Sequence, residues 1–585
     1  MSRASRQPNI SPSISWAQNR RSRRAPRLDY RTAVPIELPD LLHLDARLSM
    51  DPARVDELLE LSFLGREAAG NLDRSLASPP AAPDETWQGA LFADDLFLES
   101  LVRKLFQIEF DGLRYPVNVG FLIRTLSTPP TSCEAITFRQ DILRELDSDP
   151  DLLDRCRALY HHLVIWLDMF RAPDHTAQLD INSHRLDILQ RAKTIIDLMA
   201  DGFGDARSGL RRLHDKGELF RQSVYYRRLA DLLKFEAHDS TLTVALKIGA
   251  AGEIKDLRFV ELQENDANPF HISWSRRLWM RLKAALLDYD LSRSTIVQGV
   301  LHRVFEELSP ALVPLVQVSI HLELYLAAFG FRDRLKAAGL DTCLAAVEPA
   351  NAVRLRGLAN PLLVDEEPVP CDIVLDRPGR QTLITGPNSG GKTRLLQSLG
   401  LAQLLGQSGL FVPARQAELP LLRGMFVSLV ETETADQNEG RLGRELLRIR
   451  ALFEQAERPS LVILDELCSG TNPAEGTEIV SLVLRLLERM GSDAFISTHF
   501  LEYVRRLEAD PPTAGLRFLQ VEPAPERRST YQFVAGVAAS SLAVETAARL
   551  GVTFDELARL IDARTAPDQE LAADAPALQS DTVSR

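Results

Sequence analysis

The feature that most constrains this chain is a glycine-rich segment at residues 386–393. It reads Gly-Pro-Asn-Ser-Gly-Gly-Lys-Thr and fits the phosphate-binding loop, which is a glycine, four residues and then Gly-Lys-Ser/Thr. A short apolar, β-prone run at 381–385 precedes it, and apolar residues at helical spacing follow it over 394–405. Strand, glycine loop and helix are the context in which this pattern forms a nucleotide site, which favours that interpretation over a chance glycine turn.

The loop predicts which groups bind the nucleotide. Glycines let backbone N–H groups surround a triphosphate, and the following helix points its positive end at the phosphates. We expect the Lys392 amine to reach the β- and γ-phosphates and the Thr393 hydroxyl to ligate magnesium. ATP and Mg²⁺ are the expected cofactors, and the predicted binding residues are Gly386, Pro387, Asn388, Ser389, Gly390, Gly391, Lys392 and Thr393.

Composition excludes several classes of protein. At 585 residues the chain should form several domains, because single cores stop growing near about 250–300 residues. Its net charge of -13 argues against a wholly basic nucleic-acid binder. The five cysteines form no Cys-x-x-Cys pair, so neither a disulfide framework nor a zinc site is indicated. We found no apolar run of the roughly 18–20 residues that span a membrane, and expect a cytoplasmic protein.

The predicted organisation has five parts. Residues 1–40 form a disordered basic arm, which either contacts phosphates or is a solvated tail, and 41–90 hold a short helical segment and a linker at 78–83. Residues 91–350 are mainly helical, with a β-hairpin near 240–264, and the long helices either pack as a bundle or project as arms. Residues 351–562 alternate strands and helices, as in an α/β phosphate-loop ATPase domain whose parallel sheet is covered on both faces. The tail at 563–585 is expected to be disordered.

Two further segments complete the predicted ATP site. An apolar strand at 460–464 ends in Asp465 and Glu466, which we expect to hold magnesium and to act as general base, although two acids could simply end a strand. A short strand at 493–499 ends in His499, which is predicted to sense the γ-phosphate; a lone histidine is otherwise usually a satisfied polar residue. The predicted catalytic residues are therefore Glu466, Lys392 and His499. Gln437 lies either near the nucleotide or on a solvated loop.

These residues resemble the ATPase domain of the MutS family. The resemblance covers the 386–393 loop with Phe411-Val-Pro-Ala, the segment Leu464-Asp-Glu to Gly476, Ser497-Thr-His-Phe, and Tyr531 to Gly536. It is specific over 355–555, and weaker over 95–350, where Arg139-Gln is similar to the start of the family's helical core. The resemblance implies two ATP sites at a homodimer interface, a nucleotide-driven change in how the subunits clasp a duplex, and slow turnover.

Several departures from the family pattern refine this expectation. No segment resembles the N-terminal domain that carries the family's Phe-x-Glu mismatch wedge, so mismatch reading by that wedge is not expected. The chain is more similar to the second bacterial subfamily, which is associated with branched nucleic acid, suppression of recombination and stalled ribosomes. That subfamily usually adds a nuclease domain, for which the tail leaves no room. Arg441 stands where the family places a contact to the partner's nucleotide, and either serves the γ-phosphate in trans or marks a lost contact. Asn360 replaces a family histidine, so adenine recognition is expected to differ.

Two functions follow from these predictions. The first is a dimeric, DNA-binding, nucleotide-switched ATPase clamp in DNA repair or recombination control, in which branched or duplex DNA is held by the helical domain. The alternative is a nucleotide-switched interaction protein that clasps a ribosome or a protein partner.

Overall fold

The structure, a computed structural model, describes most of the chain between residues 39 and 565. The described ranges are 39–63, 86–171, 181–223, 226–227, 229–230, 233, 241–248, 254–263, 293–375, 381–387, 390–429, 441–469, 471–511, 515–522, 530–539 and 550–565. The predicted basic arm up to residue 38, the linker at 78–83 and the tail after 565 lie outside them.

The C-terminal half is built on a six-stranded sheet. Its order is β12 (Gly424–Ser428), β13 (Ser460–Leu464), β14 (Asp493–Ser497), β9 (Gln381–Thr385), β15 (Leu516–Val521) and β16 (Phe533–Ala535). The first five strands are parallel, and β16 pairs antiparallel with β15 at one edge. The three strands predicted at the site are present: β9 and β13 have the predicted bounds, and β14 ends at Ser497, two residues before the predicted end. The strand carrying the glycine loop is thus separated from the strand carrying the acids by β14 alone.

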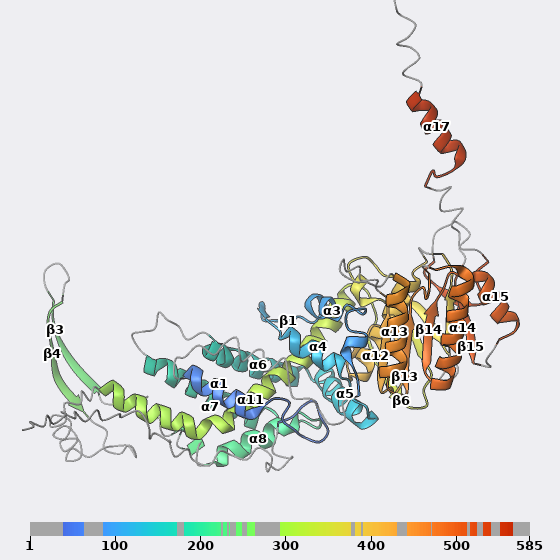
Figure 1. Ribbon diagram of the computed structural model, residues 1–585. Helices are drawn as coiled ribbons and strands as arrows, with labels where there is room; N and C mark the ends of the chain where they lie inside the picture. The colour runs from blue at the N-terminus through green and yellow to red at the C-terminus, as the bar shows by residue number, and fades with distance from the viewer. Residues whose placement is uncertain are drawn as a thin grey trace, which may run out of the picture.

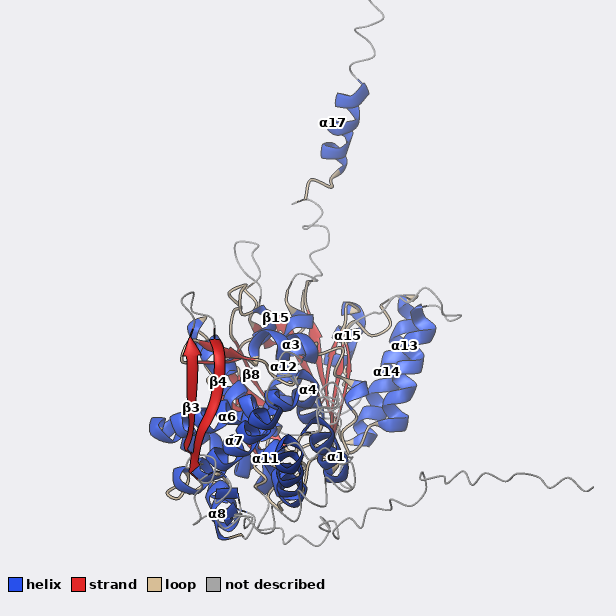
Figure 2. Ribbon diagram, turned by 90° about the vertical axis from the view of Figure 1, so that its left-hand side faces the viewer, coloured by secondary structure: helices blue, strands red, loops and turns tan. Residues whose placement is uncertain are grey.

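Both faces of this sheet are covered, as predicted for a parallel sheet. Successive residues of β13 alternate between two cores: Leu461 and Ile463 belong to one, and Val462 and Leu464 to the other. Helix α12 (Lys392–Gln407) contributes to the first core. Helices α13 (Arg441–Gln455), α14 (Pro473–Met490) and α15 (Leu501–Ala509) contribute to the second. Figure 2 shows α13 and α14 side by side at one edge of the molecule.

A second sheet was not predicted from the sequence. Its order is β6 (Ala346–Glu348), β11 (Gln416–Pro420), β7 (Arg354–Leu358) and β8 (Cys371–Val374). Beside it, β5 (Cys343–Leu344) pairs with β10 (Phe411–Val412). Strands of two to five residues are too short to show a clear period of two, which explains why sequence patterning missed them.

The preceding half is helical. It consists of α1 (Pro52–Phe63), α3 (Leu98–Leu105), α4 (Val119–Ser127), α5 (Cys133–Ser148), α6 (Pro150–Arg171), α7 (Ile181–Gly202), α8 (Arg211–Gln222) and α11 (Arg293–Ala337), with a single turn η2 (Gly89–Leu91) ahead of α3. At 1.5 Å per residue, α11 is about 68 Å long. Its central part packs among α1, α6 and α7, and its N-terminal end continues outward to the hairpin of β3 (Thr241–Ile248) and β4 (Ile254–Gln263) (Figure 1). The long helices therefore form both a bundle and a projecting arm.

Helix α11 also contains an apolar stretch of membrane-spanning length. The stretch Leu312–Ala337 is long and apolar enough to cross a bilayer, but its most apolar 18-residue window is entirely buried inside the protein. Its composition is that of a core helix.

The helical segment predicted within 41–90 is present as α1, and residues 41–51 ahead of it are not helical. In the mainly helical region predicted from residue 91, α3 is followed by β1 (Ile108–Phe110) and β2 (Leu113–Tyr115), which form a small hairpin. Residues 39–50, here named the N-terminal strap, have no helix because their backbone groups bond to distant side chains instead. The Arg212 guanidinium donates to the carbonyls of Asp40 and His43, each at 2.7 Å, and to that of Leu44. Long-range hydrogen bonds thus override local helical spacing here.

Arg139 fixes the strap to the end of α12. Its side chain is only 4 % exposed. Nε donates to the Leu42 carbonyl at 2.9 Å, and Nη1 donates to the Ser408 carbonyl, just past α12, at 3.2 Å. One buried cation therefore connects α5, the N-terminal strap and the helix that begins at the glycine loop.

The strap also encloses two buried titratable groups. The Asp40 carboxylate accepts hydrogen bonds from the backbone N–H of Leu42 at 2.8 Å and from the His43 ring at 2.8 Å. Burial opposes its charge, but these bonds and its positive neighbours hold the pKa of Asp40 well below its usual range. His321 on α11 accepts the Leu41 N–H at Nδ1, while its Nε2 is buried without a partner. Burial lowers the pKa of His321 to about 3.

Acid is expected to destabilise the protein through His321. Between its ordinary pKa of 6.5 and the folded value of about 3, the unfolded state binds a proton that the folded state does not. Stability should therefore fall by about 1.4 kcal/mol per pH unit below pH 6.5 from this residue alone. Urea unfolding at pH 7, 6 and 5 measures the slope, and His321→Asn, which keeps an acceptor near the Nδ1 position, should make it shallower. An equal slope in that variant would assign the acid sensitivity to other groups.

Candidate nucleotide-binding and hydrolysis site

The glycine loop has the backbone that its sequence predicts. It leaves β9 at Gly386, whose φ is 137°, and enters α12 through Gly391, a left-handed N-cap residue with φ of 85°. A Cβ on Gly386 or on Gly390 would lie 2.7 Å from Cγ2 of Val521, at the end of β15. Space excludes a side chain at both positions, and the positive φ of Gly386 excludes one there by conformation as well. Asn388 and Ser389 lie outside the described residues.

Lys392 lies against this loop. It is 3 % exposed, and its Nζ donates to the carbonyls of Gly386 at 3.0 Å and Pro387 at 3.1 Å. Burial lowers the pKa of the Lys392 amine, and the charges of Glu466 and Asp465 oppose that shift. The amine therefore lies against the loop carbonyls, and its contact with the phosphates stays a prediction.

The predicted magnesium ligands come together. The Thr393 hydroxyl, at the start of α12, donates to Oδ2 of Asp465, at the end of β13, at 2.5 Å. A hydroxyl and a carboxylate oxygen are the ligand types that Mg²⁺ takes in phosphate-loop sites, where substrate phosphates and water supply the others. Consistent with so small a protein ligand set, the described part of the chain gathers no three His, Cys, Asp or Glu into a metal cluster. The residues present fit a magnesium–nucleotide complex.

Glu466 is held in an unusual backbone conformation. Its φ is 49°, in the left-handed region that non-glycine residues rarely adopt. Its N–H donates to the Ser497 hydroxyl at 2.9 Å, and its carbonyl accepts from Ser469 N–H at 3.0 Å. The same Ser497 hydroxyl donates to Oδ1 of Asp465. Sequence reasoning quoted Ser497 only as part of a motif and missed this double contact.

His499 lies two residues beyond the end of β14, at the edge where β9 and β13 also end. Its ring is half-buried and packs against Phe500, with 4.3 Å between ring centroids. The preceding residue, Thr498, donates its N–H to the Ile384 carbonyl at 3.1 Å. The sheet therefore brings His499 to the same edge as the glycine loop, and its role as a γ-phosphate sensor stays a prediction.

The remaining predicted residues differ in position. Asn360 is 5 % exposed, caps the turn η3 (Pro361–Leu363), and donates to the Arg394 carbonyl at 3.2 Å and to Gln397 at 2.9 Å. Its side chain is thus engaged with α12. Arg441 is the first residue of α13, but its side chain, like Gln437, lies outside what the structure describes.

Two residues near the site had no predicted role of their own. Tyr531 has a φ of 55°, and a Cβ on Gly391 would lie 3.1 Å from its ring, so the ring lies beside the entry to α12. Glu445 on α13 accepts the Cys468 N–H at 2.6 Å and so anchors the turn that follows Glu466. Neither contact has a local sequence signal, because each joins separate elements.

The fold and the site together define a phosphate-loop nucleotide-binding protein. A parallel sheet brings a glycine loop, a lysine, a hydroxyl and two adjacent acids to one edge.

Comparison with known proteins agrees with this class. Residues 382–559 match the family model of MutS domain V. Curated relatives include proteins named Endonuclease MutS2 from Thermomicrobium roseum, 32% identical over 303 residues (50% of this chain and 37% of the relative), and Thermus thermophilus, 29% identical over 457 residues (74% and 58%). The chain thus spans less than two thirds of the length of these relatives. These findings confirm the predicted resemblance to the MutS family, and the relatives named MutS2 confirm the similarity to its second bacterial subfamily.

Proposed function

We propose that this protein hydrolyses ATP and uses the hydrolysis cycle to switch a dimeric clamp on DNA. The observation that carries the proposal is the 2.5 Å contact between Thr393 and Asp465, which lie 72 residues apart in the chain. It joins the glycine loop to the acids at the end of β13, as a magnesium-dependent phosphoryl-transfer site requires.

Each site residue has a part in the proposed reaction. The loop N–H groups and the Lys392 amine bind and orient the phosphates, and Thr393 and Asp465 hold the magnesium ion. When bound, that ion neutralises charge on the phosphate oxygens. The Glu466 carboxylate accepts a proton from the attacking water, and His499 is proposed to respond to the γ-phosphate. Turnover is expected to be slow because it is coupled to a change of shape.

Helix α12 provides a path from the nucleotide to the helical half. Its N-terminal end holds Lys392 and Thr393, and its other end, about 24 Å away, is bonded through Ser408 to Arg139. Arg139 holds the N-terminal strap, which also bonds to α8 through Arg212 and to α11 through His321. We propose that phosphate-dependent displacement of α12 is passed along these contacts to the projecting arm.

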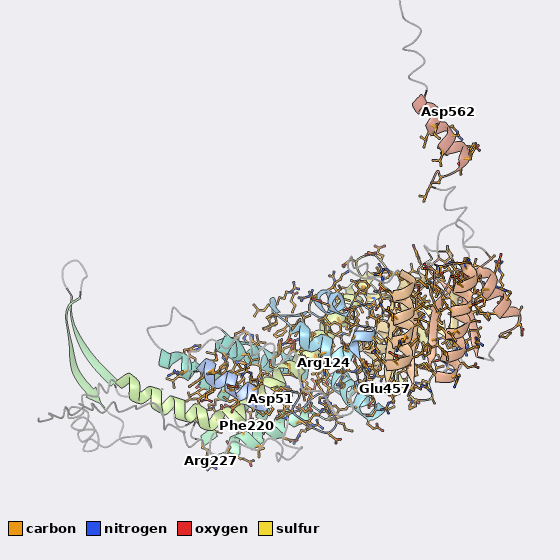
Figure 3. The ribbon with its side chains drawn as sticks, viewed as in Figure 1. Asp51, Arg124, Phe220, Arg227, Glu457 and Asp562 are labelled. Atoms are coloured by element: carbon orange, nitrogen blue, oxygen red, sulfur yellow. The ribbon has the colours of Figure 1, made fainter. Side chains whose placement is uncertain are left out.

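A homodimer is supported by α17 (Phe554–Thr565). This helix stands away from the ATPase sheet, with its side chains in solvent (Figure 3). Its exposed apolar residues include Phe554 at 86 % and Ile561 at 62 %, which share one face together with Leu557. A face of this kind needs a partner, and we propose a second copy of this chain, as the MutS resemblance implies.

We propose that the clamp holds DNA. The alternative is that it holds a ribosome or a protein partner, and the net charge of -13 favours this alternative. The two differ in salt dependence. For a DNA clamp, log affinity for duplex or branched DNA should fall linearly with log salt, by about 0.9 for each phosphate neutralised. Fluorescence anisotropy with ATP present, at KCl concentrations from about 50 to about 300 mM, measures this slope. Absent binding or a zero slope would reject DNA, while ATP hydrolysis without DNA binding would favour the alternative.

A further inference from the structure

We propose that Ser497 is a positioning residue for ATP hydrolysis, through which one hydroxyl sets both acids of the site. The inference rests on the proposed ATPase function and extends it to a residue not assigned any role above. It stands on the two hydrogen bonds of Ser497 and on the backbone conformation of Glu466.

The Ser497 hydroxyl both accepts and donates a hydrogen bond. It accepts the N–H of Glu466 at 2.9 Å and donates its proton to Oδ1 of Asp465. The other Asp465 oxygen, Oδ2, accepts from Thr393 at 2.5 Å. Both oxygens of the Asp465 carboxylate therefore accept a hydrogen bond. The bond from Ser497 fixes the rotation of the carboxylate so that Oδ2 faces the glycine loop.

Glu466 depends on the same hydroxyl through its backbone. A non-glycine residue in the left-handed region costs of order 1–3 kcal/mol and persists only when its surroundings hold it there. The N–H bond to Ser497 is one of those restraints, and the bond from Ser469 N–H to the Glu466 carbonyl is another. Loss of the first lets the peptide between Asp465 and Glu466 rotate and moves the carboxylate of the proposed base.

The position of Ser497 in the sheet explains how it reaches both acids. It is the last residue of β14 and is fully buried. Strand β14 is hydrogen-bonded to β13, which carries the acids, and to β9, which leads into the loop. Two residues further on lies His499. A shift at the end of β14 would therefore be transmitted by one hydroxyl to the metal-side carboxylate and to the base together.

The test compares Ser497→Ala with a matched control, Ser460→Ala. Ser460 is also fully buried in the same sheet, but its hydroxyl pairs with Ser492 at 3.0 Å, at the opposite end of β13. For Ser497→Ala we expect kcat to fall about 10- to 100-fold, the loss of one hydrogen bond to a charged group, with KM for ATP changed less than about threefold. Ser497→Thr, which keeps the hydroxyl, should recover most of kcat, and Ser460→Ala should keep the parent value.

The outcomes separate this inference from the proposed function. Purified parent protein that does not hydrolyse ATP would reject the proposed function and this role with it. Active parent protein whose kcat is unchanged by Ser497→Ala would reject the positioning role alone. A loss of kcat that Ser497→Thr does not recover, or that Ser460→Ala shares together with a lowered melting temperature, would assign Ser497 a purely structural part.

Discussion

Replacing Glu466 with Gln is expected to lower kcat for ATP hydrolysis by about 10²- to 10⁴-fold, the usual contribution of a general base. Glutamine keeps the size and the backbone conformation of the residue but cannot accept the proton of the attacking water. The groups proposed to bind the nucleotide, the loop N–H groups, Lys392, Thr393 and Asp465, are all unchanged. The variant should therefore still bind ATP and retain it unhydrolysed, which filter binding and a phosphate-release assay measure together.

Lys392→Ala is the control for this prediction. It removes the amine that lies over the loop carbonyls, so nucleotide affinity itself should fall. Gel filtration with ATP then distinguishes the two variants: Glu466→Gln should be fixed in the ATP-bound assembly, and Lys392→Ala should behave as it does without nucleotide. A Glu466→Gln protein that hydrolyses ATP like the parent would show that another group activates the water.

If the proposed homodimer forms through α17, the double change Phe554→Ser and Ile561→Ser is expected to convert it to a monomer. Burial of each of these side chains contributes about 1.5–3 kcal/mol, and in a two-fold symmetric dimer every substitution acts twice. The dimer dissociation constant should rise at least about a hundredfold. Sedimentation velocity across a concentration series measures it. Because the proposed sites are completed across the dimer interface, ATP hydrolysis should fall with the dimer.

Arg559→Ala is the matched control on the other face of α17. Arg559 is exposed, and its ion pair with Glu556, at 3.5 Å, lies within the helix. Such pairs contribute little to stability, so this variant should stay dimeric. If the double variant also stays dimeric, the apolar face of α17 is not the dimer contact.

Much of the site could be predicted from the sequence because buried parallel strands leave a local signal. The run Ser460–Leu464 is apolar after its first residue and ends where the acids begin, and the structure gives it the same bounds. The Thr393–Asp465 contact follows once the strands are parallel neighbours of β14, since their carboxyl ends meet at one edge of the sheet. Pattern and topology together were sufficient for these residues.

The parts that the sequence did not predict depend on contacts between distant segments. Arg139 bonds to Leu42, 97 residues away, and to Ser408, 269 residues away, and neither partner carries a recognisable pattern. These bonds also take the backbone groups that a helix over the N-terminal strap would use, which is why the helical spacing there was misleading. Ser497 was quoted within a motif, but its two-sided contact becomes visible only when β13 and β14 lie side by side.

The shared interior of the molecule has a practical consequence. A single hydrophobic cluster includes Leu41, Tyr325 on α11 and Leu396 on α12. A protein cut near residue 350 and expressed as the C-terminal piece alone would therefore expose apolar surface that the N-terminal piece normally covers, and would leave the Ser408 carbonyl without Arg139. The two halves should melt in one transition, and a recombinant ATPase fragment should be insoluble unless the N-terminal half is supplied with it.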